Sequence, residues 1–219
     1  LGFSMLPFLA SVLPLIAVPI MSRSASGDDF AALGIGMGVG AIAAALSLVG
    51  WNLLGTPRVI AAQAGAERDE LYARSFYIRS IVILPVGIVG GVIAAMIAPP
   101  SALIAAVFAV ATSLNAMTLS WYAVALAAPS MVFWYEVIPR AIATAIAIGV
   151  VLVTGDVFWY GALLIASFVV GLLVFHVIVF RRVLPKWPGS QPLREDVAVK
   201  IEQHGHAVGL VFHGNLPLL

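Results

Sequence analysis

The chain has 219 residues, of which 62% are hydrophobic and only 10% are charged, and its mean hydropathy is +1.09. An ordinary soluble domain carries about 25% charged residues, so this chain has too few polar groups to cover the surface of a water-soluble fold. The sequence contains no cysteine, which excludes a disulfide framework and a thiolate metal site. Composition therefore predicts an all-α fold, a polytopic bundle of transmembrane helices.

Six apolar segments are long enough to cross a bilayer core, which takes roughly 20 residues of helix. A seventh begins near Ala207 and continues to the last residue. We predict an N-terminal six-helix lobe over residues 1–180, a cytoplasmic connector over 181–206 and the start of a second lobe over 207–219. Because the chain starts at Leu1 and ends inside an apolar run, we expect it to be part of a longer protein. The six complete spans are predicted at residues 3–21, 30–51, 77–98, 102–126, 137–154 and 157–180.

Basic residues gather on alternate connections between these spans. Of the eleven lysines and arginines, only Arg23 lies on the other set of connections. Arg79 and Arg140 lie just inside spans that emerge from the basic side. The excess of basic residues marks the cytoplasmic side of a membrane protein, so we expect a cytoplasmic N-terminus in the inner membrane. The connections on the basic side are 52–76, 127–136 and 181–206.

Small residues and prolines predict how the spans pack and bend. Gly36, Gly40 and Ala44 recur every four residues, a spacing that lets helix backbones approach closely in lipid. Pro85 predicts a bend in the third span. Residues 64–75, in the first basic connection, are typical of a short surface helix because Glu70 and Arg74 are four residues apart in the favourable order. The four-residue spacing of small residues recurs at Gly87, Gly91 and Ala95.

The predicted fourth span carries polar side chains at helical spacing. Thr112, Asn115, Thr118 and Tyr122 would lie on one face of a continuous helix, with Trp121 beside the last of them. One interpretation is a hydrated cavity in which these groups contact a sugar. The other is hydrogen bonding between helices, with the aromatic pair anchoring the span at the interface.

Three arginines lie near the cytoplasmic ends of the predicted spans. Arg58, Arg79 and Arg140 could hold an anionic headgroup, since a guanidinium donates paired, charge-assisted bonds to phosphate. Alternatively, each arginine only extends its side chain toward the membrane interface and follows the positive-inside rule, by which basic residues gather on the cytoplasmic side. Glu136 and Arg140 are four residues apart and predict an ion pair, and His176 is expected at the interface.

No catalytic spacing is recognisable. The loose glycine pattern that starts at Gly36 lies inside a span, and the adjacent Asp28 and Asp29 lie on the side away from the cytoplasm. We therefore expect no enzymatic activity, no cofactor and no metal.

Several segments resemble a known family of transporters. Residues 50–61, GWNLLGTPRVIA, resemble the segment that closes the second helix of bacterial polysaccharide (O-antigen type) flippases, which belong to the multidrug/oligosaccharidyl-lipid/polysaccharide exporter superfamily. Residues 119–122, LSWY, with the later Glu136, Pro139 and Arg140, resemble the family's P-S-W-Y-F-x-G segment and the helix that follows it. The opening helix and its external turn are also similar, at Pro19, Ser22, Arg23, Asp29 and Phe30.

The resemblance implies one lobe of a transporter whose two lobes are related by pseudo-symmetry. It also implies a polyprenyl-diphosphate-linked glycan as cargo, carried from the cytoplasmic leaflet to the outer leaflet by alternating access. The lipid bilayer and the second lobe would be its partners, and no nucleic acid is expected. Ala123 and Ala125 replace the family's aromatic residue and glycine, so a role for that turn does not carry over.

Other functions stay open at this point. The nearest alternative is a related exporter of drugs or of a peptidoglycan precursor. A drug exporter should carry acidic residues deep in the first lobe for cation coupling, and none of the six predicted spans has one near its centre. A membrane-embedded glycan transferase or polymerase should have a large external loop, whereas the predicted external connections are short. A non-catalytic scaffold would have no requirement for the polar residues of the fourth span.

Overall fold

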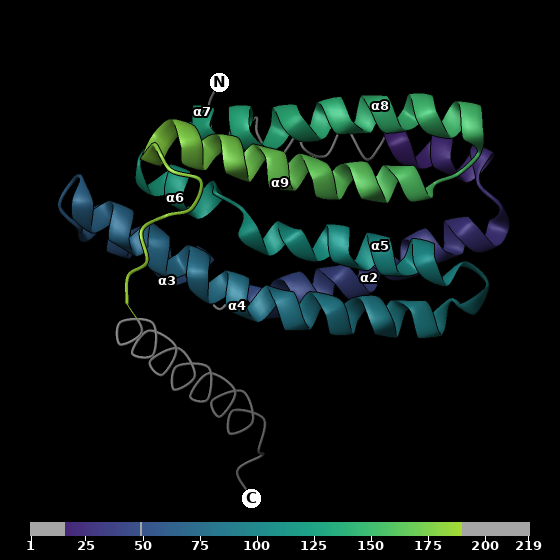
Figure 1. The fold of residues 1–219 in the computed structure, drawn as a ribbon, viewed down its shortest axis with the longest axis horizontal. Helices are drawn as coiled ribbons and strands as arrows, with labels where there is room; N and C mark the ends of the chain where they lie inside the picture. Colours follow the sequence, from purple (N-terminus) through teal and green to yellow (C-terminus); the bar gives the residue numbers. More distant parts are fainter. Residues whose placement is uncertain (1–15, 49, 190–219) are drawn as a thin grey trace, which may run out of the picture.

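The computed structural model describes residues 16–48 and 50–189, and this part of the chain is a helical bundle without strands (Figure 1). It confirms the predicted all-α class. Within the described residues, five helices are long and apolar enough to cross a membrane: Gly27–Ala61, Ala66–Ile97, Pro99–Ala125, Pro129–Thr154 and Phe158–Phe180. The predicted first span is described only from residue 16, with residues 16–24 helical, and the predicted seventh lies outside the described residues.

The outside of the bundle is apolar. On helix α4 (Ala66–Ile97), the Leu84 side chain is 66% exposed and the Ile88 side chain is 64% exposed, and both would face water in a soluble protein. A monomeric soluble protein rarely exposes large continuous apolar patches. Exposed aliphatic side chains along all five long helices therefore identify a multi-pass membrane protein whose outer surface contacts lipid.

The predicted second span continues past its expected end. Helix α2 (Gly27–Ser47) is followed by α3 (Trp51–Ala61), and Gly50 between them has a φ of +70°. Glycine adopts this left-handed conformation without steric penalty, so the chain turns here without leaving the bundle. The prediction of a connection from residue 52 was wrong, because residues 51–61 form a helix that packs against the bundle.

Helix α4 joins two elements that the sequence separated. The predicted surface helix at 64–75 and the predicted third span form one helix of 32 residues, Ala66–Ile97. Glu70 and Arg74 form the expected ion pair near its start, with 2.6 Å between Oε1 and Nη2. Pro85 lies inside the helix without ending it.

The predicted fourth span is not one regular helix. After the short turn η1 (Pro99–Ser101), helix α5 (Ala102–Ser113) passes into the tight turn η2 (Leu114–Met117). The chain then becomes extended at Thr118, and the short helix α6 (Ser120–Ala125) follows. The expectation of a continuous helix from 102 to 126 was therefore wrong.

The fifth span begins earlier than predicted. Pro129 starts the short helix α7 (Pro129–Val132), a proline being favourable in the first helical turn because its missing N–H has no helical partner there. One turn of π-helix, η3 (Phe133–Val137), leads into α8 (Ile138–Thr154), which ends at Gly155. Glu136 therefore lies inside a span and not in a connection. The last described helix, α9 (Phe158–Phe180), matches its prediction closely.

Close packing of α2 on α5 confirms the small-residue prediction. A Cβ atom added at Gly36 would come within 2.8 Å of the Phe108 Cβ atom, and one added at Gly40 would come within 2.7 Å of the Thr112 Cβ atom. Helices α2, α4 and α5 pack together, α8 packs along α9, and α9 also contacts α5, which joins the two groups (Figure 1). This arrangement places Leu119, the residue before α6, against Glu136 of η3.

Candidate functional site

The centre of the candidate site is a break in the membrane-spanning segment Pro99–Ala125, here called the junction (residues 114–120). Thr118 has a φ of −50° and a ψ of 144°, which interrupts the helix between η2 and α6. A helix break leaves carbonyls on one side and N–H groups on the other without helical partners. Inside a bilayer no water replaces those partners, so other groups of the protein must bind them.

Arg79 of α4 binds the carbonyl side of the junction. Its Nη1 atom donates to the carbonyl oxygens of Ala116 at 2.7 Å and Thr118 at 2.9 Å, and Nε donates to the Ser75 carbonyl at 3.3 Å. The side chain is completely buried, and its guanidinium carbon lies 5.7 Å from the centre of the Trp121 ring. Arg79 therefore stabilises the junction from inside the protein and does not face an open cavity.

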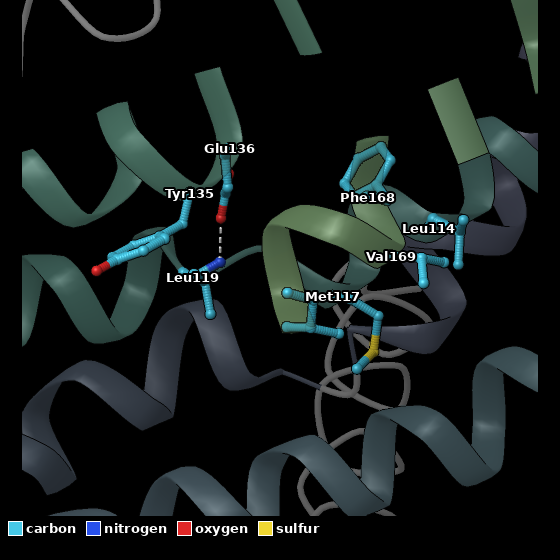
Figure 2. Close-up of a pocket in the computed structure, with 8 residues that line it drawn as sticks. Leu114, Met117, Leu119, Tyr135, Glu136, Phe168 and Val169 are labelled. Atoms are coloured by element: carbon cyan, nitrogen blue, oxygen red, sulfur yellow. Dashed lines mark hydrogen bonds between the residues drawn. The ribbon is translucent and has the colours of Figure 1, made fainter. Parts of the chain in front are cut away.

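Glu136 of η3 binds the other side of the junction. The backbone N–H of Leu119 donates to Oε1 of Glu136, a contact that Figure 2 shows as a dashed line. The Thr118 hydroxyl also donates to the carboxylate and lies 3.0 and 3.1 Å from its two oxygens. One break is thus held from both directions, by a cation at its carbonyls and by an anion at its N–H group.

A second polar pair lies at the same junction. Nη2 of Arg140, from α8, donates to Oδ1 of Asn115 at 3.0 Å. The Arg140 guanidinium carbon also lies 4.5 Å from the centre of the Phe168 ring, a cation–π distance. In place of the predicted ion pair with Glu136, Arg140 thus bonds to an amide, because η3 directs Glu136 to Leu119. Asn115 is exposed and Arg140 is half-buried, so this pair can be reached from outside.

A small pocket of about 60 Å³ lies beside the junction (Figure 2). Among the described residues of its wall, Glu136 is the one that carries a charge, and the remaining side chains are aliphatic, aromatic or methionine. This volume has room for a few water molecules, since each needs about 10–15 Å³, but it is too small for a sugar. The pocket is lined by Leu114, Met117, Leu119, Tyr135, Glu136, Phe168, Val169 and Leu172.

The predicted polar stripe does not form a single face. Trp121 and Tyr122 are each 3% exposed and pack into the main core, with the Trp121 ring 5.4 Å from the Trp51 ring and the Tyr122 ring 5.1 Å from the Tyr72 ring. The break at Thr118 rotates α6 relative to α5, so these aromatic residues turn inward.

The other members of the stripe have separate environments. Thr112 packs against Gly40 of α2, Asn115 faces Arg140, and Thr118 faces Glu136. The structure therefore brings three of the five residues to the charged side chains of the junction: Asn115 lies at Arg140, Thr118 lies at Glu136, and the Trp121 ring lies at Arg79.

The three predicted headgroup arginines also separate. Arg79 and Arg140 both reach the junction, from α4 and α8 respectively. Arg58 lies half-buried in the last turn of α3, the helix that packs on α6. Only Arg140 combines a position at the junction with partial exposure.

Two residues acquire roles that sequence reasoning missed. Glu136 was placed in a connection, although Pro129 is a signal for an earlier helix start. His176 was expected at the interface but is 1% exposed, with Nε2 at 2.8 Å from the Tyr72 hydroxyl and Nδ1 at 3.1 Å from the Val183 carbonyl. No local spacing links Tyr72 to His176, because they are 104 positions apart.

Comparisons with protein-family models, with curated proteins and with solved structures each found no match. The structure by itself defines the class of protein: a multi-pass helical membrane protein with a broken span whose break is held by Arg79 and Glu136.

Proposed function

We propose that this chain forms one lobe of a transporter that moves a lipid-linked saccharide precursor across the cytoplasmic membrane by alternating access. The resemblance of residues 50–61 and 119–122 to polysaccharide flippases supports the substrate class. Discontinuous spans and ionisable residues within the membrane, both of which accompany transport pathways, support the kind of activity. The proposal is carried by the junction, where these two features coincide.

The charges at the junction favour an anionic cargo. Arg79 and Arg140 bring two positive charges to the junction, while Glu136 brings one negative charge. The surplus of one positive charge lies where unpaired charge is costly. A diphosphate arriving at the junction would compensate it, which gives the site a preference for an anionic headgroup.

Within this proposal, Arg140 and Asn115 are the first contacts of the diphosphate. Arg140 is half-buried and exchanges its bond to the Asn115 amide for a charge-assisted bond to a phosphate oxygen. Arg79 keeps the junction in shape from behind. Arg58 belongs to the basic end of the bundle, together with Arg182 and Lys186. By the positive-inside rule, this end faces the cytoplasm.

The test is a flipping assay on the complete two-lobe transporter that contains this lobe, reconstituted in vesicles with a fluorescent short-chain polyprenyl diphosphate disaccharide and an external quencher. Arg140→Ala should slow flipping by about tenfold or more, because a hydrogen bond to a charged group contributes about 1.5–3 kcal/mol. Arg182→Ala, an exposed arginine after α9, is the matched control and should flip at the unsubstituted rate. Equal rates in all three proteins would reject the proposal.

A drug exporter is the second candidate, and one observation favours it. The sequence argument against it was that no span carried an acidic residue near its centre, and the structure places Glu136 inside the span Pro129–Thr154. Extrusion of a cationic dye from the same vesicles, lost in Glu136→Gln and unaffected by a lipid-linked saccharide, would select this alternative.

A further inference from the structure

We infer that Glu136 is a proton-binding site, and that a proton on its carboxylate releases the junction so that α6 separates from η3. The proton-linked movement stands on the geometry alone. Its use as the coupling step of saccharide transport rests on the proposed function.

Glu136 differs in position from the other acidic residues of the described helices. Asp28 and Asp29 lie in the first turn of α2, and the acidic residues of α4 lie in its first two turns. Glu136 is set back from Pro129, where its span begins, and its carboxylate touches the backbone of a different span. An ionisable side chain in such a place marks a functional site more often than a structural one.

The described arrangement suits an ionised Glu136. The Leu119 N–H can only donate a hydrogen bond, so it favours the ionised carboxylate, and the Thr118 hydroxyl also donates to that carboxylate in this arrangement. Among the described residues, the charged and titratable groups that interact electrostatically with it are Arg140 from α8 and Arg79 and Tyr72 from α4. From α9, Phe168 and Leu172 line the shared pocket and carry no charge.

Release of the junction would favour the protonated form of Glu136 over the ionised form. If α6 moves away, the carboxylate loses the Leu119 and Thr118 donors, and an ionised carboxylate without donors is very unfavourable in lipid. A proton then removes the charge. Reciprocally, a proton placed on Glu136 in the described arrangement converts one accepting oxygen into a donor, which weakens its bond to the Leu119 N–H. Linkage requires these two effects to be equal in size.

The pocket beside the junction supplies the route for the proton. Glu136 lines it, and its volume of about 60 Å³ admits a few water molecules. The step is a simple proton transfer: a hydronium ion gives its proton to a carboxylate oxygen and leaves as water. No other bond forms or breaks.

The experiment measures the distance between α6 and α8 at different pH values in nanodiscs, with no substrate present. Because the sequence contains no cysteine, spin labels can be attached at cysteines introduced for Val124 and Ile146, which are 47% and 51% exposed. The unsubstituted protein should show two distance populations whose ratio shifts toward the released state as pH falls, by at most about tenfold per pH unit for one proton. Glu136→Gln should show the released distance at every pH, whereas the control Glu70→Gln should keep the pH response.

A second variant covers the case in which Glu136→Gln does not fold. Thr118→Val removes one donor from the ionised carboxylate while keeping the side-chain volume, so the midpoint of the distance change should move to higher pH. A pH-independent distance in the unsubstituted protein, or an unchanged midpoint in Thr118→Val, would overturn the inference. A proton-linked movement without saccharide flipping would keep it and would reject only the proposed function.

Discussion

The Tyr72 hydroxyl lies 2.8 Å from Nε2 of His176, and both side chains are buried between α4 and α9. The Val183 carbonyl, 3.1 Å from Nδ1, can only accept a hydrogen bond. Nδ1 therefore carries the proton of the neutral imidazole, and Nε2 accepts from Tyr72. The pair joins two spans to the segment that follows α9, in which the Pro185 carbonyl also accepts from the Tyr77 hydroxyl at 2.8 Å.

Tyr72→Phe should lower the free energy of unfolding by about 1–3 kcal/mol, because it leaves the buried Nε2 atom without a donor. Thermal unfolding in detergent, followed by helical circular dichroism, measures the loss. The matched control is Tyr77→Phe, which removes a hydroxyl from a half-buried tyrosine and should cost less. Equal losses in the two variants would contradict the assigned role of Tyr72.

Gly40→Ala should separate α2 from α5, because the added methyl group would meet Thr112 and the carbonyl of Ala109. Overpacking of this kind typically costs about 1–3 kcal/mol, which should appear as a lower unfolding temperature. Gly38→Ala is the matched control on the same helix, since a Cβ atom there meets nothing within 4 Å. It should leave the unfolding temperature unchanged or raise it slightly.

Arg79→Met should destabilise the protein strongly, because the carbonyls of Ala116 and Thr118 lose their shared donor inside the membrane. Two hydrogen bonds from a charged group represent about 3–6 kcal/mol. Arg79→Lys should recover part of this loss, since an ammonium group can donate to both carbonyls but lacks the planar fork. Unfolding measurements on both variants, with Arg182→Met as the exposed control, decide the matter. An Arg79→Met protein that unfolds like the unsubstituted protein would show that the junction does not depend on this side chain.

Asn115→Asp should separate substrate binding from stability. The new carboxylate would pair with Arg140 and cancel the surplus positive charge at the junction. Flipping of the diphosphate lipid should then slow by about tenfold, while the unfolding temperature stays level or rises. Asn115→Gln keeps the amide and should flip normally. An Asn115→Asp protein that flips at the unsubstituted rate would remove Arg140 from the headgroup site.

The long apolar segments were predictable from the sequence, and their breaks were not. The prediction for α9 differs from the structure by one residue at its start, since its apolar run is continuous and ends at Arg181. The fourth span looked equally continuous. Its break depends on Arg79, 37 positions before Ala116, and on Glu136, 17 positions after Leu119, and no local pattern reports such partners.

The candidate site was predictable only in its residue types. Sequence reasoning selected Arg79, Arg140, Asn115 and Thr118 because polar groups in lipid are rare, and all four reach the junction. It paired Arg140 with Glu136, whereas Arg140 bonds to Asn115, and it put Thr118 on one face with Tyr122 because it assumed one straight helix. Pro129 was the available signal that the fifth span starts earlier than predicted. This earlier start places Glu136 inside the membrane-spanning segment.

The buried position of Arg79 also constrains the order in which the protein is built. An arginine in the middle of a helix opposes insertion by about 2.5–3.5 kcal/mol when the helix enters the bilayer alone. The carbonyl that Arg79 binds at Ala116 is synthesised 37 residues later, which takes a ribosome roughly 2–7 s at about 5–20 residues per second. During that interval α4 has no partner for its charge. Helix α4 should therefore remain at the insertion machinery until α5 and η2 emerge, and enter the lipid together with them as a single unit.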